Sequence, residues 1–155
     1  MGLSLCSLLW GNHKATVQES SRISCALPLR SLQITSSFGY RTHPVTGVWQ
    51  FHNGVDLRAH SDTVFAIMEG VVMQTGYDRL LGIYIRIAHA KDVISIYGHL
   101  SVPWVLPGEF VESNEAIGQT GCSGRTTGEH LHFSILYSGR YIDPIKFLSR
   151  ILTTP

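Results

Sequence analysis

The stretch Gly128-Glu129-His130-Leu131-His132-Phe133 is the part of the sequence around which the rest of the chain can be arranged. It follows a loop-like run of glycine, serine and threonine, and it leads into the apolar segment 133–137, which is typical of a β-strand. Side chains alternate along a strand, so His130 and His132 are expected to face one site, roughly 6–7 Å apart. The residues between and after them would pack on the opposite face. One imidazole could bind a metal while the other reaches the metal's open position, or both could bind.

A second stretch, Phe51-His52-Asn53-Gly54-Val55-Asp56-Leu57, supplies further metal-type donors. A straight strand would hold His52 and Asp56 about 13 Å apart, too far to share an ion. Gly54 lies between them and allows a bend, because glycine tolerates backbone angles that other residues avoid. Catalytic zinc usually takes three protein ligands of this chemistry and leaves a fourth position for water. A third histidine, His99, lies at a predicted strand end.

Composition indicates a single globular domain. The chain has 155 residues, 44% hydrophobic and 15% charged, which is enough to build one core and argues against disorder. A net charge of +1 gives no electrostatic case for binding nucleic acid or acidic lipid. Fifteen glycines and short apolar runs favour many short strands over long helices. The prediction is an all-β domain, mainly antiparallel, with minor helical turns.

Local patterns add details to this all-β prediction. Residues 83–89 alternate with period two, and Lys91-Asp92 then predicts a tight hairpin connection into the next strand at 93–97. The other local predictions are a loop at 40–49, a turn at 76–78, a loop or single helical turn at 102–106, and one helical turn starting at Pro144.

The first part of the chain is predicted to be a leader, residues 1–26, ahead of a domain body at 27–155. Its first ten residues are apolar, but they lack a basic leading region and are too short for a membrane span. No export signal is therefore visible. The cysteines Cys6, Cys25 and Cys122 are odd in number with no CxxC pair, which disfavours both a cysteine zinc site and a disulfide framework. One disulfide bridge remains possible, but the sequence does not indicate which two cysteines would form it.

The other candidate residues have weaker contexts. Cys122 is interpreted as a small loop residue and not as a nucleophile, because no base is spare beside it. Arg125 could contact a substrate carboxylate or simply face water. The remaining histidines are expected at the surface or in loops; they are His13, His43, His60 and His89.

Three motifs in order, with their surroundings, resemble a known family. They are His52-x-x-x-Asp56, Tyr97-Gly98-His99-Leu100 and His130-Leu131-His132. Together with the flanking segments 38–47 and 123–128, they resemble the zinc metallopeptidases of the lysostaphin/LytM type, peptidase family M23. The resemblance covers about Leu27 to Leu148.

This resemblance implies a compact antiparallel β fold with a groove over one zinc ion per chain. It also implies hydrolysis of peptide bonds in bacterial peptidoglycan by metal-activated water. Carried over by position, His52, Asp56 and His132 would be the zinc ligands, and His99 and His130 the unliganded catalytic histidines. The substrate-binding residues stay unknown.

Several alternatives remain open beside the endopeptidase. The domain could be a non-catalytic LytM-type module that binds and activates a cell-wall amidase, or a zinc peptidase with another substrate. A polar leader residue such as Asn12 or His13 could occupy the zinc's open position and make the enzyme latent. The resemblance places the protein outside the cytoplasm, with peptidoglycan peptides as partners, no nucleic acid, no membrane span and no indicated partner protein.

Overall fold

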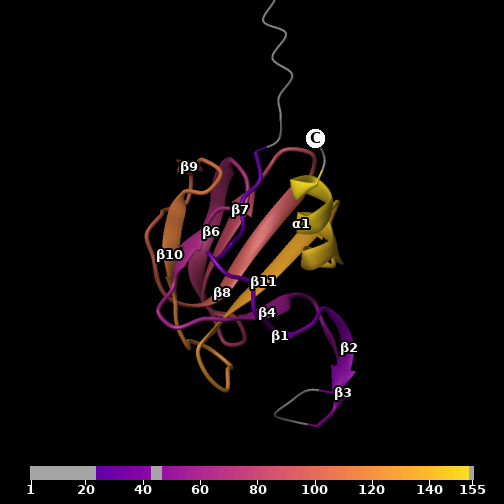
Figure 1. The fold of residues 1–155 in the computed structure, drawn as a ribbon. Helices are drawn as coiled ribbons and strands as arrows, with labels where there is room; N and C mark the ends of the chain where they lie inside the picture. Colours follow the sequence, from indigo (N-terminus) through magenta and orange to yellow (C-terminus); the bar gives the residue numbers. More distant parts are fainter. Residues whose placement is uncertain (1–23, 43–46, 154–155) are drawn as a thin grey trace, which may run out of the picture.

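The computed structural model describes residues 24–42 and 47–153. One large β-sheet is the main feature of this part of the chain (Figure 1). The sheet has ten strands, and each strand pair in it is antiparallel. The strands of its main path, in spatial order, are β1 (Ile34–Ser36), β4 (Val55–Arg58), β11 (His130–Tyr137), β8 (Val93–Pro103), β7 (Gly82–Ala88), β6 (Gly70–Asp78) and β9 (Phe110–Val111). The all-β, mainly antiparallel prediction is confirmed.

Six further elements complete the described part of the fold. Strand β10 (Ala116–Thr120) pairs with β5 (Thr63–Phe65) and with the end of β8, and β12 (Arg140–Ile142) pairs with β11. Strands β2 (Gly39–Thr42) and β3 (Trp49–His52) form a separate hairpin, which projects from the body of the molecule in Figure 1. Helix α1 (Pro144–Leu152) follows the last strand and lies beside β11.

The tight connection between β7 and β8 is confirmed. Lys91 and Asp92 both have positive φ, 58° and 57°, and His89 N donates to Val93 O at 2.8 Å across the turn. Positive φ at both central residues is the backbone of a type I′ turn, whose twist matches that of the strands it joins.

Alternation along β11 divides the molecule into a core side and a site side. Leu131, Phe133 and Ile135 are fully buried in the hydrophobic core. Burial of each such side chain contributes about 1.5–3 kcal/mol. The intervening residues His130, His132 and Ser134 therefore face the other side of the sheet, where they line a groove.

The sequence predicts a loop at 40–49, but both ends of this segment belong to strands, since residues 40–42 of β2 pair with residues 49–51 of β3. Tyr40 lies opposite Phe51 in the register, with ring centroids 5.1 Å apart, and Tyr40 stacks on Trp49 at 6.2 Å. These aromatic pairs stabilise a hairpin that period-two patterning alone did not indicate. Residues 43–46, including His43, lie outside the described residues.

One other local prediction is wrong and two are right only in part. Residues 76–78 do not turn but continue β6, paired with the start of β7. Of the loop predicted at 102–106, Val102 and Pro103 belong to β8 and pair with β10, and 104–106 form a loop. The last helix begins at Pro144 as predicted, but it is longer than one turn. It has nine residues, since Asp143 caps its N-terminus by accepting from Ile145 N and Lys146 N and its apolar side packs on the sheet.

Gly54 lies where the chain leaves the small hairpin and enters the large sheet. A Cβ at this position would lie 2.6 Å from the Phe133 carbonyl oxygen and would also overlap the Ser134 hydroxyl. Only glycine allows the backbone between β3 and β4 to approach β11 so closely. The bend predicted at Gly54 brings His52 and Asp56 together, with His52 Nε2 3.2 Å from Asp56 Oδ1.

We predict that Gly54→Ala lowers the free energy of unfolding by about 2 kcal/mol, because the added methyl group overpacks the junction with β11. Urea unfolding followed by circular dichroism measures this change. Gly128→Ala is the matched control, since a Cβ at Gly128 meets no atom within 4 Å. Equal stability of the two variants would contradict the close approach.

Candidate metal and catalytic site

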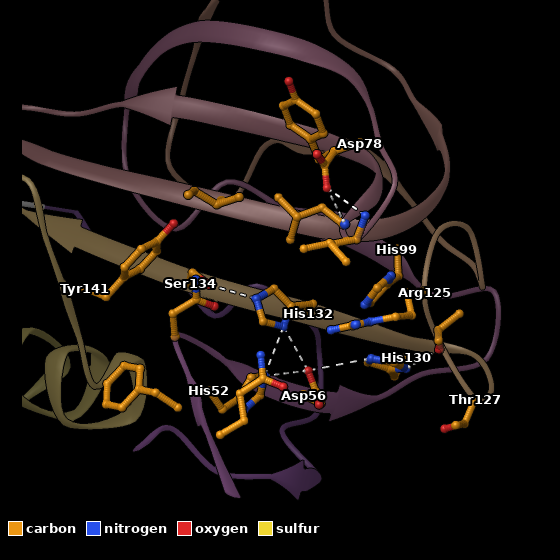
Figure 2. A pocket seen from close by; sticks show the side chains of 18 of the residues that line it. His52, Asp56, Asp78, His99, Arg125, Thr127, His130, His132, Ser134 and Tyr141 are labelled. Atoms are coloured by element: carbon orange, nitrogen blue, oxygen red, sulfur yellow. Dashed lines mark hydrogen bonds and ion pairs between the residues drawn. The ribbon is translucent and has the colours of Figure 1, made fainter. Parts of the chain in front are cut away.

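The groove collects side chains from four strands around one point (Figure 2). His132 on β11 lies directly opposite Asp56 on β4, and His52 comes from the end of β3. His130 lies two residues earlier on the same face of β11, and His99 comes from β8. The structure therefore brings all five predicted site residues into one groove.

Three donor atoms converge tightly enough to hold one ion. His52 Nε2 is 3.2 Å from His132 Nδ1 and 3.2 Å from Asp56 Oδ1, and His132 Nδ1 is 2.9 Å from Asp56 Oδ1. A tetrahedral zinc with ligand bonds of about 2.0–2.1 Å separates its ligand atoms by about 3.3 Å. Two imidazole nitrogens and one carboxylate oxygen at this spacing fit a zinc ion in both geometry and chemistry.

The far ring nitrogens of both histidines are held by neighbours. His52 Nδ1 donates to the carbonyl oxygen of Ser37 at 2.9 Å, and His132 Nε2 lies 2.9 Å from the Ser134 hydroxyl. Such partners fix the tautomer and the ring direction of a metal-binding histidine. Sequence reasoning missed Ser134 in this role, although its position two residues after His132 on one strand face could have indicated it.

Asp56 stays ionised in this half-buried setting. Burial alone would raise the pKa of Asp56, but the adjacent imidazoles of His132 and His52 hold that pKa well below its ordinary value. Arg41 from β2 adds a cation, with its Nη2 3.6 Å from Asp56 Oδ2. Burial lowers the pKa of His132, so the neutral imidazole that a metal requires is favoured.

His99 and His130 form a second pair beside the three donors. Their ring centroids are 4.6 Å apart, and His130 Nε2 is 3.6 Å from Asp56 Oδ1. Each ring contacts a backbone carbonyl through Nδ1, that of Ser123 at 2.8 Å for His99 and that of Gly128 at 2.9 Å for His130. Donation from Nδ1 leaves the Nε2 lone pair of each ring free to take a proton.

His99 reaches the groove through a local irregularity in β8. The sequence predicted a strand end here, but β8 continues for four residues beyond His99. Strict alternation would send His99 to the core side with Tyr97; instead it has a φ of 60°, and the register between β7 and β8 shifts beside it. Burial, with the nearby His130 and His132, lowers the pKa of His99 to about 4.

The groove extends well beyond the five predicted residues. Its volume is about 480 Å³, and Arg125 lies beside His99 and His130 in Figure 2. Sequence reasoning left open whether Arg125 faces the substrate or water, and the structure places it on the groove wall. The other lining residues that carry polar groups and were not predicted include Arg41, Gln50, Asp78, Tyr84, Arg86 and Tyr141.

Among the described residues, the remaining histidines and cysteines do not line this groove. His60 is almost fully exposed, as expected. His89 lies in the connection between β7 and β8, as expected, but its ring is half-buried and contacts the Glu69 carbonyl at 2.7 Å and the Ser95 hydroxyl at 2.8 Å. Cys25 and Cys122 are free thiols. The predictions for Cys6 and His13 lie outside the described residues.

The sequence matches the family model described as Peptidase family M23 over residues 50–144, which is more than half of the chain. The chain belongs to this peptidase family. The matched region includes the five predicted site residues, from His52 to His132, whereas Ser37 and Arg41 lie ahead of it.

Two curated relatives are similar over the same region. The DD-carboxypeptidase/endopeptidase Mpg of Neisseria meningitidis is 38% identical over 120 residues, covering 77% of this chain and 28% of that protein. The peptidoglycan DD-endopeptidase ShyC of Vibrio cholerae is 38% identical over 119 residues, covering 76% of this chain and 28% of that protein. The chain therefore spans less than a third of the length of either relative.

Two solved structures share the fold. A zinc-containing peptidase from Vibrio cholerae superposes with a TM-score of 0.73 at 34% identity, covering 79% of this chain and 39% of that one. The catalytic domain of lysostaphin from Staphylococcus simulans superposes with a TM-score of 0.69 at 27% identity, covering 76% of this chain and 92% of that one. The predicted resemblance to the lysostaphin/LytM type is confirmed.

We predict that Ser134→Ala weakens zinc binding by about 10- to 100-fold, because His132 loses the partner of its far nitrogen. Competition against a chromophoric chelator measures the dissociation constant. Ser149→Ala, a serine on the exposed side of α1, is the matched control and should bind zinc as the unmodified chain does. Unchanged affinity in Ser134→Ala would show that the hydroxyl does not orient the ring.

Proposed function

We propose that this domain is a zinc-dependent endopeptidase that hydrolyses peptide bonds of bacterial peptidoglycan, in a stem peptide or a cross-bridge. One observation carries the proposal: three metal-type donor atoms lie within 2.9–3.2 Å of one another, with two further histidines beside them in an open groove. Membership of the peptidase family supports it, as do the names of the two relatives, which describe a DD-carboxypeptidase/endopeptidase and a peptidoglycan DD-endopeptidase.

In this proposal His52, Asp56 and His132 hold one zinc ion. Zinc in such a site supplies a Lewis acid that polarises the scissile carbonyl and makes water a nucleophile near neutral pH. The carboxylate of Asp56 offsets part of the metal's charge, and Arg41 holds the second oxygen of that carboxylate. The bonds to Ser37 and Ser134 keep both imidazoles aimed at the ion.

His99 and His130 are proposed as the catalytic histidines. With Nδ1 of each ring held by a carbonyl, Nε2 is the atom that can accept a proton from the attacking water. The imidazolium that forms can then stabilise the developing oxyanion or donate a proton to the leaving amine. Because the two rings lie only 4.6 Å apart between centroids, both can address the same reacting carbonyl.

Action on peptidoglycan would place the domain outside the cytoplasm, in the periplasm, the cell envelope or the medium. Among the described residues, no helix has the length and apolar character needed to cross a membrane. The division into a leader at 1–26 and a peptidase domain at 27–155 also stays a proposal, because residues 1–23 lie outside the described part of the chain.

The alternatives differ in what the groove would do. A module that only binds and activates an amidase has no use for a second histidine pair with free Nε2 atoms. Retention of both histidines and all three donors in one groove therefore favours a hydrolase over that module. A zinc peptidase with a substrate other than peptidoglycan would share this chemistry and is separated from the leading proposal by its substrate alone.

Alanine variants separate the two groups of residues. We predict that His99→Ala and His130→Ala keep one zinc per chain but lower hydrolysis at least about 100-fold, since each removes a proton-transfer group. We expect His132→Ala to lose both zinc and hydrolysis. Elemental analysis and the release of soluble fragments from purified peptidoglycan give the two readouts.

His60→Ala is the matched control, because this exposed histidine lies outside the groove and should keep both properties. Loss of zinc from His99→Ala or His130→Ala would overturn the assignment of the ligands. Full zinc content without fragment release from the unmodified chain would contradict peptidoglycan as the substrate.

A further inference from the structure

Arg86 occupies the floor of the groove away from the metal-type donors. It lies on β7 directly opposite Ile96 on β8, and Ile96 lies opposite Ser134 on β11. These three residues form one row across the sheet and all line the groove. With neighbouring strands about 4.8 Å apart, the backbone of Arg86 is about 10 Å from that of Ser134, whose hydroxyl contacts His132.

The guanidinium of Arg86 is held in place but is not paired. Its Nε is buried and has no hydrogen-bond partner, and within the described residues no carboxylate lies within ion-pair distance of its side chain. The guanidinium carbon Cζ of Arg86 lies 5.7 Å from the centroid of the Tyr84 ring, within the range of a cation–π contact. Arg41 also has a buried, unpartnered Nε, but Arg41 is already paired with Asp56.

Asp78 is the acidic group that interacts electrostatically with Arg86, and it is engaged elsewhere. Its Oδ1 accepts hydrogen bonds from Leu80 N at 2.7 Å and Leu81 N at 3.0 Å. These two bonds, with a smaller contribution from the Arg86 charge, lower the pKa of Asp78. Asp78 therefore balances part of the positive charge but leaves the guanidinium without a hydrogen-bonded anion.

A half-buried guanidinium with an unsatisfied donor is costly unless an anion binds it, and a carboxylate matches its planar fork of N–H groups. An extended peptide advances about 3.3 Å per residue, so about 10 Å corresponds to roughly three residues. Suppose that a peptide lies along the groove from the three donors towards β7. A substrate group that is two to three residues away from the scissile bond then lies above Arg86.

On the basis of the proposed endopeptidase function, we propose that Arg86 is a specificity-determining residue that binds a free carboxylate of the substrate peptide. The carboxylate lies two to three residues from the bond that is cleaved. It can be the C-terminal carboxylate of a short peptide or the side-chain carboxylate of a longer one, and the guanidinium recognises both by the same chemistry.

Matched substrates and variants test this proposal. The probe is a synthetic cross-linked stem-peptide dimer in three forms: all carboxylates free, the C-terminal carboxylate amidated, or the side-chain carboxylates amidated. For the unmodified protein we expect amidation of the recognised group to lower kcat/KM by about tenfold or more, mainly through KM. Loss with the C-terminally amidated dimer identifies the C-terminal carboxylate as the recognised group, and loss with the side-chain-amidated dimer identifies a side-chain carboxylate.

Arg86→Gln is expected to cleave the acidic and amidated dimers at equal rates, close to the rate of the unmodified protein on the amidated one. Arg86→Lys should keep part of the preference, because it retains the charge without the planar fork. Arg140→Gln is the charge-matched control, since Arg140 is exposed on β12 and does not line the groove. Asp78→Asn should strengthen the preference for the acidic dimer by removing the competing charge.

An unchanged preference for the acidic dimer in Arg86→Gln, or no preference in the unmodified protein, would overturn the inference while leaving the endopeptidase function intact. If no form of the dimer is cleaved, the proposed function fails on this substrate. Calorimetric binding of the same dimers to the unmodified protein and to Arg86→Gln then decides the inference. Tighter binding of the acidic dimer that is lost in Arg86→Gln supports it, and equal binding overturns it.

Discussion

The alternation of side chains along β11 is the constraint on which both the core and the site depend. One face of this strand buries Leu131, Phe133 and Ile135 completely, and the packing of that face fixes the register of β11 between β4 and β8. A slip of one residue would move the apolar set into the groove and the histidines into the core. The free energy that forms the core therefore also sets the position of the groove-facing histidines.

The site is assembled from polar groups that are costly to bury, and each group is compensated by a neighbour. Asp56 is surrounded by imidazole donors and by Arg41, and the far nitrogens of His52 and His132 contact the Ser37 carbonyl and the Ser134 hydroxyl. These outer contacts orient the three residues, so that His52 Nε2, His132 Nδ1 and Asp56 Oδ1 already face one point and little rearrangement is needed to bind an ion. The same network requires Gly54, because any side chain there would collide with β11.

Much of this arrangement could be predicted from local sequence. Period-two alternation located the shared face of His130 and His132, and the glycine between His52 and Asp56 indicated the bend that joins them. Hydrophobic alternation and turn residues were also sufficient for the antiparallel all-β fold and for the turn at Lys91 and Asp92. These features depend on residues close together in the chain, for which spacing rules are reliable.

The features that were missed depend on contacts between distant segments. His99 faces the groove because of its positive φ and the register shift between β8 and β7, and side-chain alternation in the sequence cannot predict either feature. The β2–β3 hairpin depends on aromatic pairing across a predicted loop, as between Tyr40 and Phe51. Arg86 resembles any strand arginine in the sequence, and only the alignment of β7, β8 and β11 places it on the groove floor.

Anomalous diffraction at the zinc absorption edge from crystals of the zinc-loaded protein would test the central claim most directly, because it locates the ion against individual donor atoms. We predict a single peak at bonding distance, about 2.0–2.2 Å, from His52 Nε2, Asp56 Oδ1 and His132 Nδ1, with His99 and His130 close by but unbound. A peak bound by His99 or His130 in place of one of these donors, or no peak in the groove, would contradict it.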